Sequence, residues 1–169
     1  MILGKMGLEN KFKDLSDVSM RKGVGKGISL VQEAAKSNCP SHDGELRQSI
    51  YSHIEEDENV IRGICGPAAK HGVYVELGTG PKGQAKHAGI SPEVTVAYTQ
   101  SPWWIHEGLG ENEIDRATAE HYHFFHIDTP QGRFYQCSGQ AAQPYLYPAL
   151  KDNEDEIVRI IAKEVKKQL

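Results

Sequence analysis

The residues best suited to chemistry are histidines gathered in one part of the sequence. His121, His123 and His126 lie close together, and His106 precedes them with Glu107 beside it. Imidazole nitrogens are good ligands for zinc, nickel and copper. On a strand His121 and His123 would point to one side and His126 to the other, whereas a helix would bring only His123 and His126 together. Without an HExxH motif or a cysteine pair, the pattern favours solvated or interface histidines. A metal-dependent hydrolase or nuclease using all four histidines is the alternative.

A glycine-rich turn is the second candidate site. Gly78, Gly80 and Lys82 lie in the segment Gly-Thr-Gly-Pro-Lys-Gly, and backbone N–H groups in such turns can bind phosphate. A Walker loop requires GxxxxGK followed by Ser or Thr and a helix, whereas Pro81 removes a donor from the middle of this turn. The segment is therefore more typical of a tight turn that ends a strand. No GxSxG elbow is present, and although two carboxylates can meet from anywhere in a fold, nothing in the sequence raises such a pair above background. We therefore assign no catalytic, cofactor-binding or metal-binding residue.

Two adjacent tryptophans indicate a surface rather than a reactive centre. Trp103 and Trp104 are flanked by Pro102 and Ile105. Neighbouring side chains on a strand point to opposite faces, so both indoles cannot enter one small core. Aromatic residues are enriched at the centres of protein interfaces, although burial of both by a folded insertion is the competing interpretation. We predict an interface formed by Trp103, Trp104, Gly78, Thr79, Gly80, Pro81 and Lys82.

The elements that would position these residues begin with a helical region over residues 1–38. Apolar residues repeat within it at spacings of three and four. Gly23, Gly25 and Gly27 interrupt the pattern, and three glycines inside a helix cost about 3 kcal/mol relative to alanine. The sequence therefore predicts a kink or two helices, unless outside contacts hold one helix together.

Short strands are predicted over residues 45–81. Residues 46–54 and 60–65 form a hairpin, and residues 73–77 form a third strand. The apolar spacing of the first strand also suits a helix, which is the alternative there.

The remaining residues divide into a long insertion and a C-terminal helix. Residues 82–140 are the least regular part, with strand candidates at 94–98, 123–127 and 133–137. A stripe of apolar residues, with acidic residues in its first half and lysines near its end, predicts a helix over residues 144–169.

The composition is that of one small globular chain. Its 169 residues suit a single domain over residues 1–169. A net charge of −4 argues against a dedicated nucleic-acid binder, so a small nucleic-acid-binding module using N-terminal Lys and Arg residues is a minor alternative.

No apolar run reaches the length of a signal peptide or a membrane span, so we expect no membrane association. The odd number and wide spacing of Cys39, Cys65 and Cys137 favour reduced thiols.

Three segments in order resemble one protein family. Ala-Lys, a proline and then Asp-Gly-Glu-Leu-Arg-Gln-Ser-Ile occupy residues 35–50, Tyr-Val-Glu-Leu-Gly-Thr-Gly occupies 74–80, and Pro-Tyr-Leu-Tyr-Pro-Ala-Leu occupies 144–150. Together they resemble the gene-product-ten-like head-tail joining proteins of tailed bacteriophages and prophages, also described as neck or tail-completion minor structural proteins. The chain departs from the family pattern at His42, at Leu77 and in the length of its insertion.

The resemblance implies an α+β fold, in which a small antiparallel sheet packs against N-terminal and C-terminal helices and carries a long irregular insertion. It implies a non-catalytic structural protein of the head-tail junction of the virion, made in the bacterial host cytoplasm. Such a protein assembles into a homo-oligomeric ring and docks to head-connector and tail proteins. We expect no cofactor and no specific nucleic acid, although DNA could pass through the assembled ring.

Overall fold

The structure consists of two compact units. The computed structural model describes residues 5–40, 44–57, 60–108, 114, 116–121 and 123–167, with side chains from residue 18 onward. The first unit comprises Met1–Gly72 and Pro144–Leu169, and the second comprises Val73–Gln143. The single domain expected from the chain length stays a prediction.

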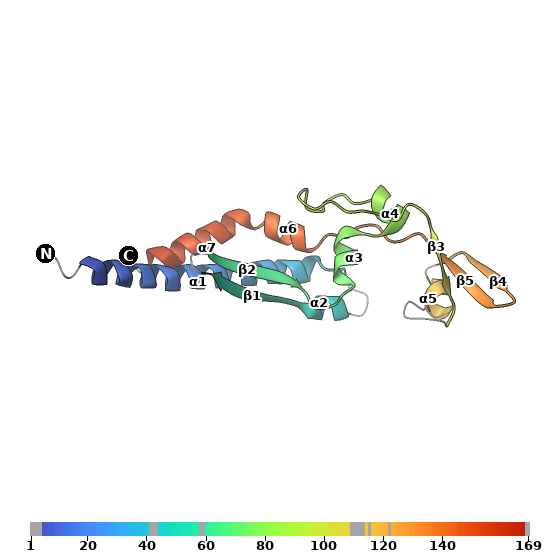
Figure 1. The fold of residues 1–169 in the computed structure, drawn as a ribbon, viewed down its shortest axis with the longest axis horizontal. Coiled ribbons are helices and arrows are strands. Elements are labelled where there is room, and N and C mark those ends of the chain that lie inside the picture. The colour runs from blue at the N-terminus through green and yellow to red at the C-terminus, as the bar shows by residue number, and fades with distance from the viewer. Residues whose placement is uncertain are drawn as a thin grey trace. The chain divides into compact units, whose positions relative to one another are not determined.

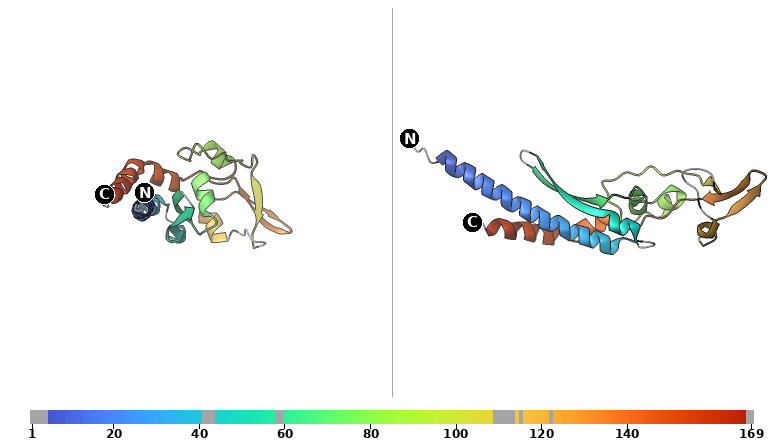
Figure 2. Two further views of the ribbon diagram at one scale, coloured as in Figure 1. Left: turned by 60° about the vertical axis from the view of Figure 1, so that its left-hand side comes forward. Right: turned by 90° about the horizontal axis from the view of Figure 1, so that it is seen from below.

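The first unit is built around one long helix. This helix, α1 (Lys5–Asn38), lies between a two-stranded hairpin on one side and the C-terminal helices on the other (Figure 1 and Figure 2). The other elements of the unit are α2 (Glu45–Ser49), β1 (Ile50–Asp57), β2 (Val60–Pro67), α6 (Leu146–Lys151) and α7 (Glu154–Lys166).

The three glycines do not interrupt α1, so the predicted kink or pair of helices is wrong. A Cβ at Gly23 would lie 2.9 Å from Ile161 Cα, and a Cβ at Gly27 would lie 3.0 Å from Ile157 Cγ2. Because these glycines have no side chains, α7 can approach the backbone of α1 closely. The burial and dispersion gained along this contact offset the poor helix propensity of glycine. Outside contacts therefore hold one helix together.

The predicted hairpin is confirmed. β1 pairs antiparallel with β2, and Ile54 lies opposite Gly63. Both residues face α1, because a Cβ at Gly25 would lie 3.2 Å from Ile54 Cδ1 and a Cβ at Gly63 would lie 2.9 Å from Ile28 Cβ. The alternate residues of both strands consequently point away from α1.

The first predicted strand, over residues 46–54, is wrong for residues 46–49, which belong to α2. Gly44 precedes this helix with φ of 84°, and its carbonyl accepts the Gln48 N–H at 3.0 Å. Leu46 and Ile50 are both buried, and a helical turn brings residues four apart to the same side. The helical alternative therefore holds up to the point where β1 begins.

The C-terminal helix predicted over residues 144–169 is in fact two helices. Between α6 and α7, the Asn153 side-chain amide donates a hydrogen bond to Ala149 O at 2.8 Å. This side-chain bond satisfies a carbonyl at the end of α6, as local bonds from Asn commonly do where a helix stops. Leu150, which belongs to the predicted apolar stripe, is exposed.

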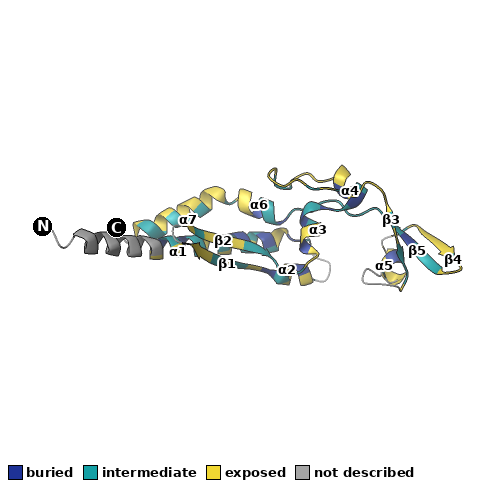
Figure 3. Ribbon diagram, in the orientation of Figure 1, coloured by how far each residue is buried: buried dark blue, intermediate teal, exposed yellow. Residues whose placement is uncertain are grey.

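The apolar core of the first unit lies where α1, α2, the start of β1 and α6 meet. Figure 3 shows these buried positions in dark blue. The buried apolar side chains are those of Val31, Ala35, Cys39, Leu46, Ile50, Tyr145 and Ala149.

One charged contact also ties α7 to α1. The Glu164 side chain is 10% exposed and accepts Lys167 Nζ at 2.6 Å and Lys26 Nζ at 2.8 Å. The hydrogen bond from Lys167, followed by that from Lys26, lowers the pKa of Glu164 to about 2. The carboxylate therefore stays ionised far below its ordinary range.

The second unit carries a three-stranded sheet and three short helices. Its antiparallel strands lie in the order β3-β5-β4. The elements are α3 (Gly72–Leu77), which starts at the boundary of the units, α4 (Gly80–Ala85), β3 (Trp103–His106), α5 (Arg116–His121), β4 (His126–Thr129) and β5 (Gly132–Cys137).

The strand predicted over residues 73–77 is wrong, because these residues form α3. The Gly78 N–H donates to Tyr74 O at 3.0 Å, which closes a helical turn. β-propensity depends on packing against neighbouring strands, and here the backbone is satisfied within the helix instead. Gly78 then ends the helix with φ of 75°, a conformation that glycine adopts without strain.

The strand candidates of the insertion have mixed outcomes. Residues 133–137 are confirmed as part of β5, whereas residues 94–98 form no strand. The candidate at 123–127 becomes a strand only from His126 onward, because His123 has φ of 52°, outside the extended region.

The α+β fold class is confirmed, with small antiparallel sheets beside helices. The strands form two separate sheets, of two and three strands, where one small sheet was predicted. Among the described helices, none has both the length and the apolar character needed to cross a membrane.

The close approach of α1 and α7 can be tested with a matched pair of alanines. Gly23→Ala should lower the free energy of unfolding by about 1–3 kcal/mol, because the new methyl meets the backbone of Ile161. Gly25→Ala is the control, since its methyl meets only the end of the Ile54 side chain and gains about 1 kcal/mol of helix propensity. Urea denaturation followed by circular dichroism measures both. A Gly23→Ala protein as stable as Gly25→Ala would contradict the close approach.

The Glu164 contact predicts a pH dependence. A carboxylate whose folded pKa is lowered stabilises the fold above its ordinary pKa of 4.5, and this stability is lost as the pH falls toward about 2. The Tm of the unchanged protein should therefore exceed that of Glu164→Gln at neutral pH, and the difference should vanish near pH 2. Thermal unfolding across this range measures both proteins. A Tm difference that does not change with pH would show that the ionised carboxylate does not stabilise this contact.

Candidate functional site

The three-stranded sheet of the second unit has two different faces. β3 is extended, so its adjacent tryptophans point to opposite sides of the sheet. Trp104 shares its face with His106, and their partners across the β3-β5 pair are Gln136 and Phe134. Trp103 therefore belongs to the other face.

Trp103 packs within the second unit. A Cβ at Gly80 would lie 2.8 Å from Trp103 Cζ3, so the indole covers the glycine turn directly. Gly80 has φ of 60°, which glycine adopts without strain. Burial by the insertion is therefore the explanation that applies to Trp103, which is half-buried.

Trp104 belongs to an exposed apolar surface. The centroid of its ring lies 6.0 Å from that of Phe125. Trp104 is 43% exposed and Phe125 is 62% exposed. Ile127, which pairs with Phe134 across β4 and β5, adds a further exposed apolar residue on the same side. We call this surface the aromatic face, and its members are Trp104, Phe125, Ile127 and Phe134.

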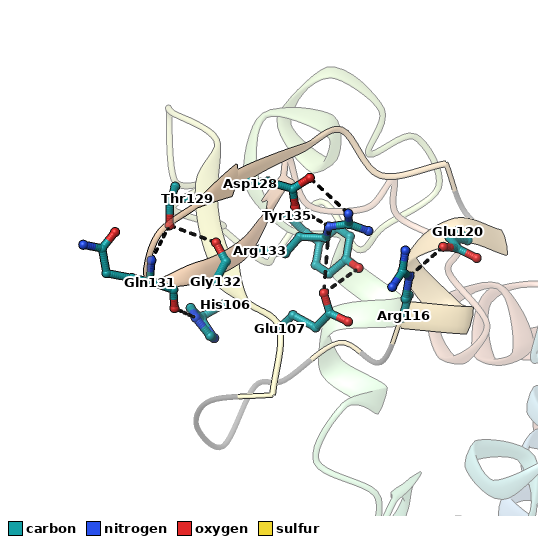
Figure 4. Close-up of polar contacts among 10 residues, drawn as sticks. All are labelled: His106, Glu107, Arg116, Glu120, Asp128, Thr129, Gln131, Gly132, Arg133 and Tyr135. Atoms are coloured by element: carbon teal, nitrogen blue, oxygen red, sulfur yellow. Dashed lines mark hydrogen bonds and ion pairs between the residues drawn. The ribbon is translucent and has the colours of Figure 1, made fainter.

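His106 closes one end of the aromatic face. Its ring stands at 88° to that of Phe134, with centroids 4.7 Å apart, and its Nε2 lies 2.9 Å from Gln131 O in the turn between β4 and β5 (Figure 4). A Cβ at Gly132 would lie 2.5 Å from this nitrogen, so only glycine fits beneath the ring. His106 thus has a structural place, holding the turn against β3.

The opposite face of the sheet holds a network of charged groups. Arg133, whose side chain is 18% exposed, lies 2.7 Å from Asp128 and 3.9 Å from Glu107, and the buried Tyr135 donates its hydroxyl to Glu107 at 3.4 Å (Figure 4). The hydrogen bond from Arg133 lowers the pKa of Asp128 and, in turn, raises the pKa of Arg133. The charged side chains of this network therefore pair with one another, on the side of the sheet away from the aromatic face.

The four candidate histidines do not form a ligand set. His106 and His126 point to opposite faces of the sheet, because His126 pairs with Tyr135 whereas His106 pairs with Phe134. His121 ends α5, and His123 lies in the turn that follows. Within the described residues, no three His, Cys, Asp or Glu side chains are grouped as a metal site would require.

The glycine turn joins α3 to α4 and is bonded to the segment at residues 138–140. The Thr79 N–H donates to Gln140 O at 2.9 Å, and the Lys82 N–H donates to Ser138 O at 3.1 Å. These two donors are therefore used by the protein itself, as in a structural turn. Of the interface residues predicted in this turn, the exposed one is Lys82, those half-buried are Thr79 and Pro81, and those buried are Gly78 and Gly80.

Sequence reasoning missed three members of the aromatic face. Phe125 and Ile127 alternate along the chain, which would have placed them on one side of a strand. Nothing local indicated that this side is shared with Trp104, because β5 lies between β3 and β4 in the sheet. Phe134 could be placed only through that same pairing.

The comparison with known proteins supports a class of structural protein. Residues 8–78 match the family model described as "Bacteriophage HK97-gp10, putative tail-component", and they run from α1 through the hairpin to α3. The resemblance to the gene-product-ten-like family is thereby confirmed over these residues. No curated protein and no solved structure matches the chain. The family match indicates a phage structural component of the tail or head-tail region.

Proposed function

We propose that this protein is a structural component of the head-tail junction of a tailed bacteriophage or prophage. It catalyses no reaction, assembles into a homo-oligomeric ring and docks to head-connector and tail proteins. It is made in the cytoplasm of the bacterial host and becomes part of the virion. The observation that supports this function most is the family match over residues 8–78.

A ring through which DNA passes acts by its shape and its contact surfaces, not by a chemical reaction. Head-to-tail contacts close into a ring when each copy offers two different patches and the rotation between copies returns to the start. Docking to connector or tail proteins requires a further surface that is left uncovered by the ring contacts. DNA passes through the ring without a specific contact, in keeping with the net charge of −4.

The aromatic face suits that further surface. Exposed apolar residues that lie together are typical of protein interaction sites, and aromatic residues supply much of the binding energy at interface centres. Trp104 and Phe125 contact each other while both remain largely exposed, so they are already placed for a partner. A side chain that is held in place before binding loses less conformational entropy when the partner arrives.

The docking proposal can be tested in virion assembly with Trp104→Ser combined with Phe125→Ser. The double variant should fold normally, since both side chains are exposed, and should bind its tail or connector partner about 100-fold more weakly. Particles assembled with it should lack tails in electron micrographs. Val94→Ser is the matched control, because Val94 is an exposed apolar residue of the same unit outside the aromatic face.

Trp103→Ser serves as a contrasting variant that should affect folding. This substitution removes the packing of the indole on Gly80, so thermal unfolding followed by circular dichroism should show a lower Tm. Tailed, fully infectious particles carrying the Trp104 and Phe125 substitutions would refute the proposed docking surface.

A further inference from the structure

The first unit presents two exposed faces on opposite sides of α1. The hairpin residues that alternate with Ile54 point away from α1, and so do the α7 residues opposite Ile157 and Ile161. The right-hand view of Figure 2 shows α1 between the hairpin and α7. The two faces therefore look in opposite directions, and a head-to-tail ring needs two different contact patches on each copy.

The hairpin face combines apolar and acidic side chains. Glu55 lies 3.2 Å from His53, and the strand register places Arg62 opposite Glu55. Near the end of the hairpin, two carboxylates, Glu55 and Asp57, nevertheless lie beside the one arginine, Arg62. We define the hairpin outer face by its exposed residues Tyr51, His53, Glu55, Asp57, Val60, Arg62 and Ile64.

The α7 face combines apolar and basic side chains. Val158 is 66% exposed, and Arg159 reaches Glu156 at 3.3 Å. In the part of the chain that the structure describes, no ion pair involves Lys163 or Lys166. These lysines and Arg159 line a shallow hollow along the helix. We define the α7 outer face by the exposed residues Val158, Arg159, Ala162, Lys163 and Lys166.

We propose that the hairpin outer face of one copy binds the α7 outer face of the next copy in the ring. This inference rests on the proposed function, because it names the two patches that the ring requires. The occupant is a second copy because the faces are complementary in charge and each offers exposed apolar side chains, with Tyr51 and Ile64 on one and Val158 and Ala162 on the other. Opposite charges select the pairing of unlike faces, and like charges disfavour contact between two hairpins or two α7 helices.

Charge reversal on each face tests the contact. One variant carries Glu55→Lys with Asp57→Lys, and the other carries Lys163→Glu with Lys166→Glu. Each variant alone places like charges at the contact, so sedimentation velocity should show its self-association weakened by at least about 100-fold. An equal mixture of the two should assemble again, because the reversed hairpin of the first variant then meets the reversed α7 of the second, and the unchanged hairpin of the second meets the unchanged α7 of the first.

Two further measurements control for folding and for position. Lys22→Glu and Glu33→Lys reverse exposed charges on α1 outside both faces and should assemble like the unchanged protein. A photo-crosslinking amino acid in place of Val158 should form bonds to residues 51–64 of another copy, identified by mass spectrometry. Cross-links that fall elsewhere would overturn the proposed contact.

The outcomes separate this inference from the proposed function. Assembly that is unaffected by either reversal, or a mixture that does not recover, overturns the contact and leaves the ring standing. An unchanged protein that stays monomeric at all concentrations overturns both the contact and the ring.

Discussion

The close approach of α1 and α7 at Gly23 and Gly27 is the constraint on which the first unit depends. Without side chains at these positions, the backbone of Ile161 lies nearly against α1, and the Glu164 carboxylate bridges the two helices through Lys26. The side of α1 away from α7 is then left to the hairpin. Because one helix serves both neighbours, the outward surfaces of the hairpin and of α7 look in opposite directions. The geometry proposed for ring assembly follows from this layering.

The sequence predicted the hairpin from local apolar patterns, and the resemblance to a known family implied the fold class. The sequence could not predict that α1 continues through three glycines, since the compensating contacts come from α7, which lies more than a hundred residues further along the chain. The helix at residues 73–77 was missed for a related reason. Its Val and Tyr residues favour a strand, and only the tertiary setting decides whether a partner strand is available.

The candidate site shows the same division between local and distant information. The alternation along a strand predicted that Trp103 and Trp104 face opposite ways, and this holds in β3. Which tryptophan is exposed depends on Gly80, and which residues join Trp104 depends on β5 lying between β3 and β4. Of the histidines, which offered the most reactive groups in the sequence, His106 and His126 lie on opposite faces of this sheet, and His121 and His123 lie outside its strands. What the second unit presents is an apolar surface, and this agrees with a structural role.

The proposed function requires that copies of this chain assemble into a closed ring. Light scattering over a range of concentrations tests it most directly, because the mass of a closed ring stops growing once the ring is complete. A closed ring should give a plateau at a fixed multiple of the 18.7 kDa chain mass, with annular particles of one size in negative-stain images. A mass that remains at one chain, or that grows without a plateau as an open filament would, contradicts it.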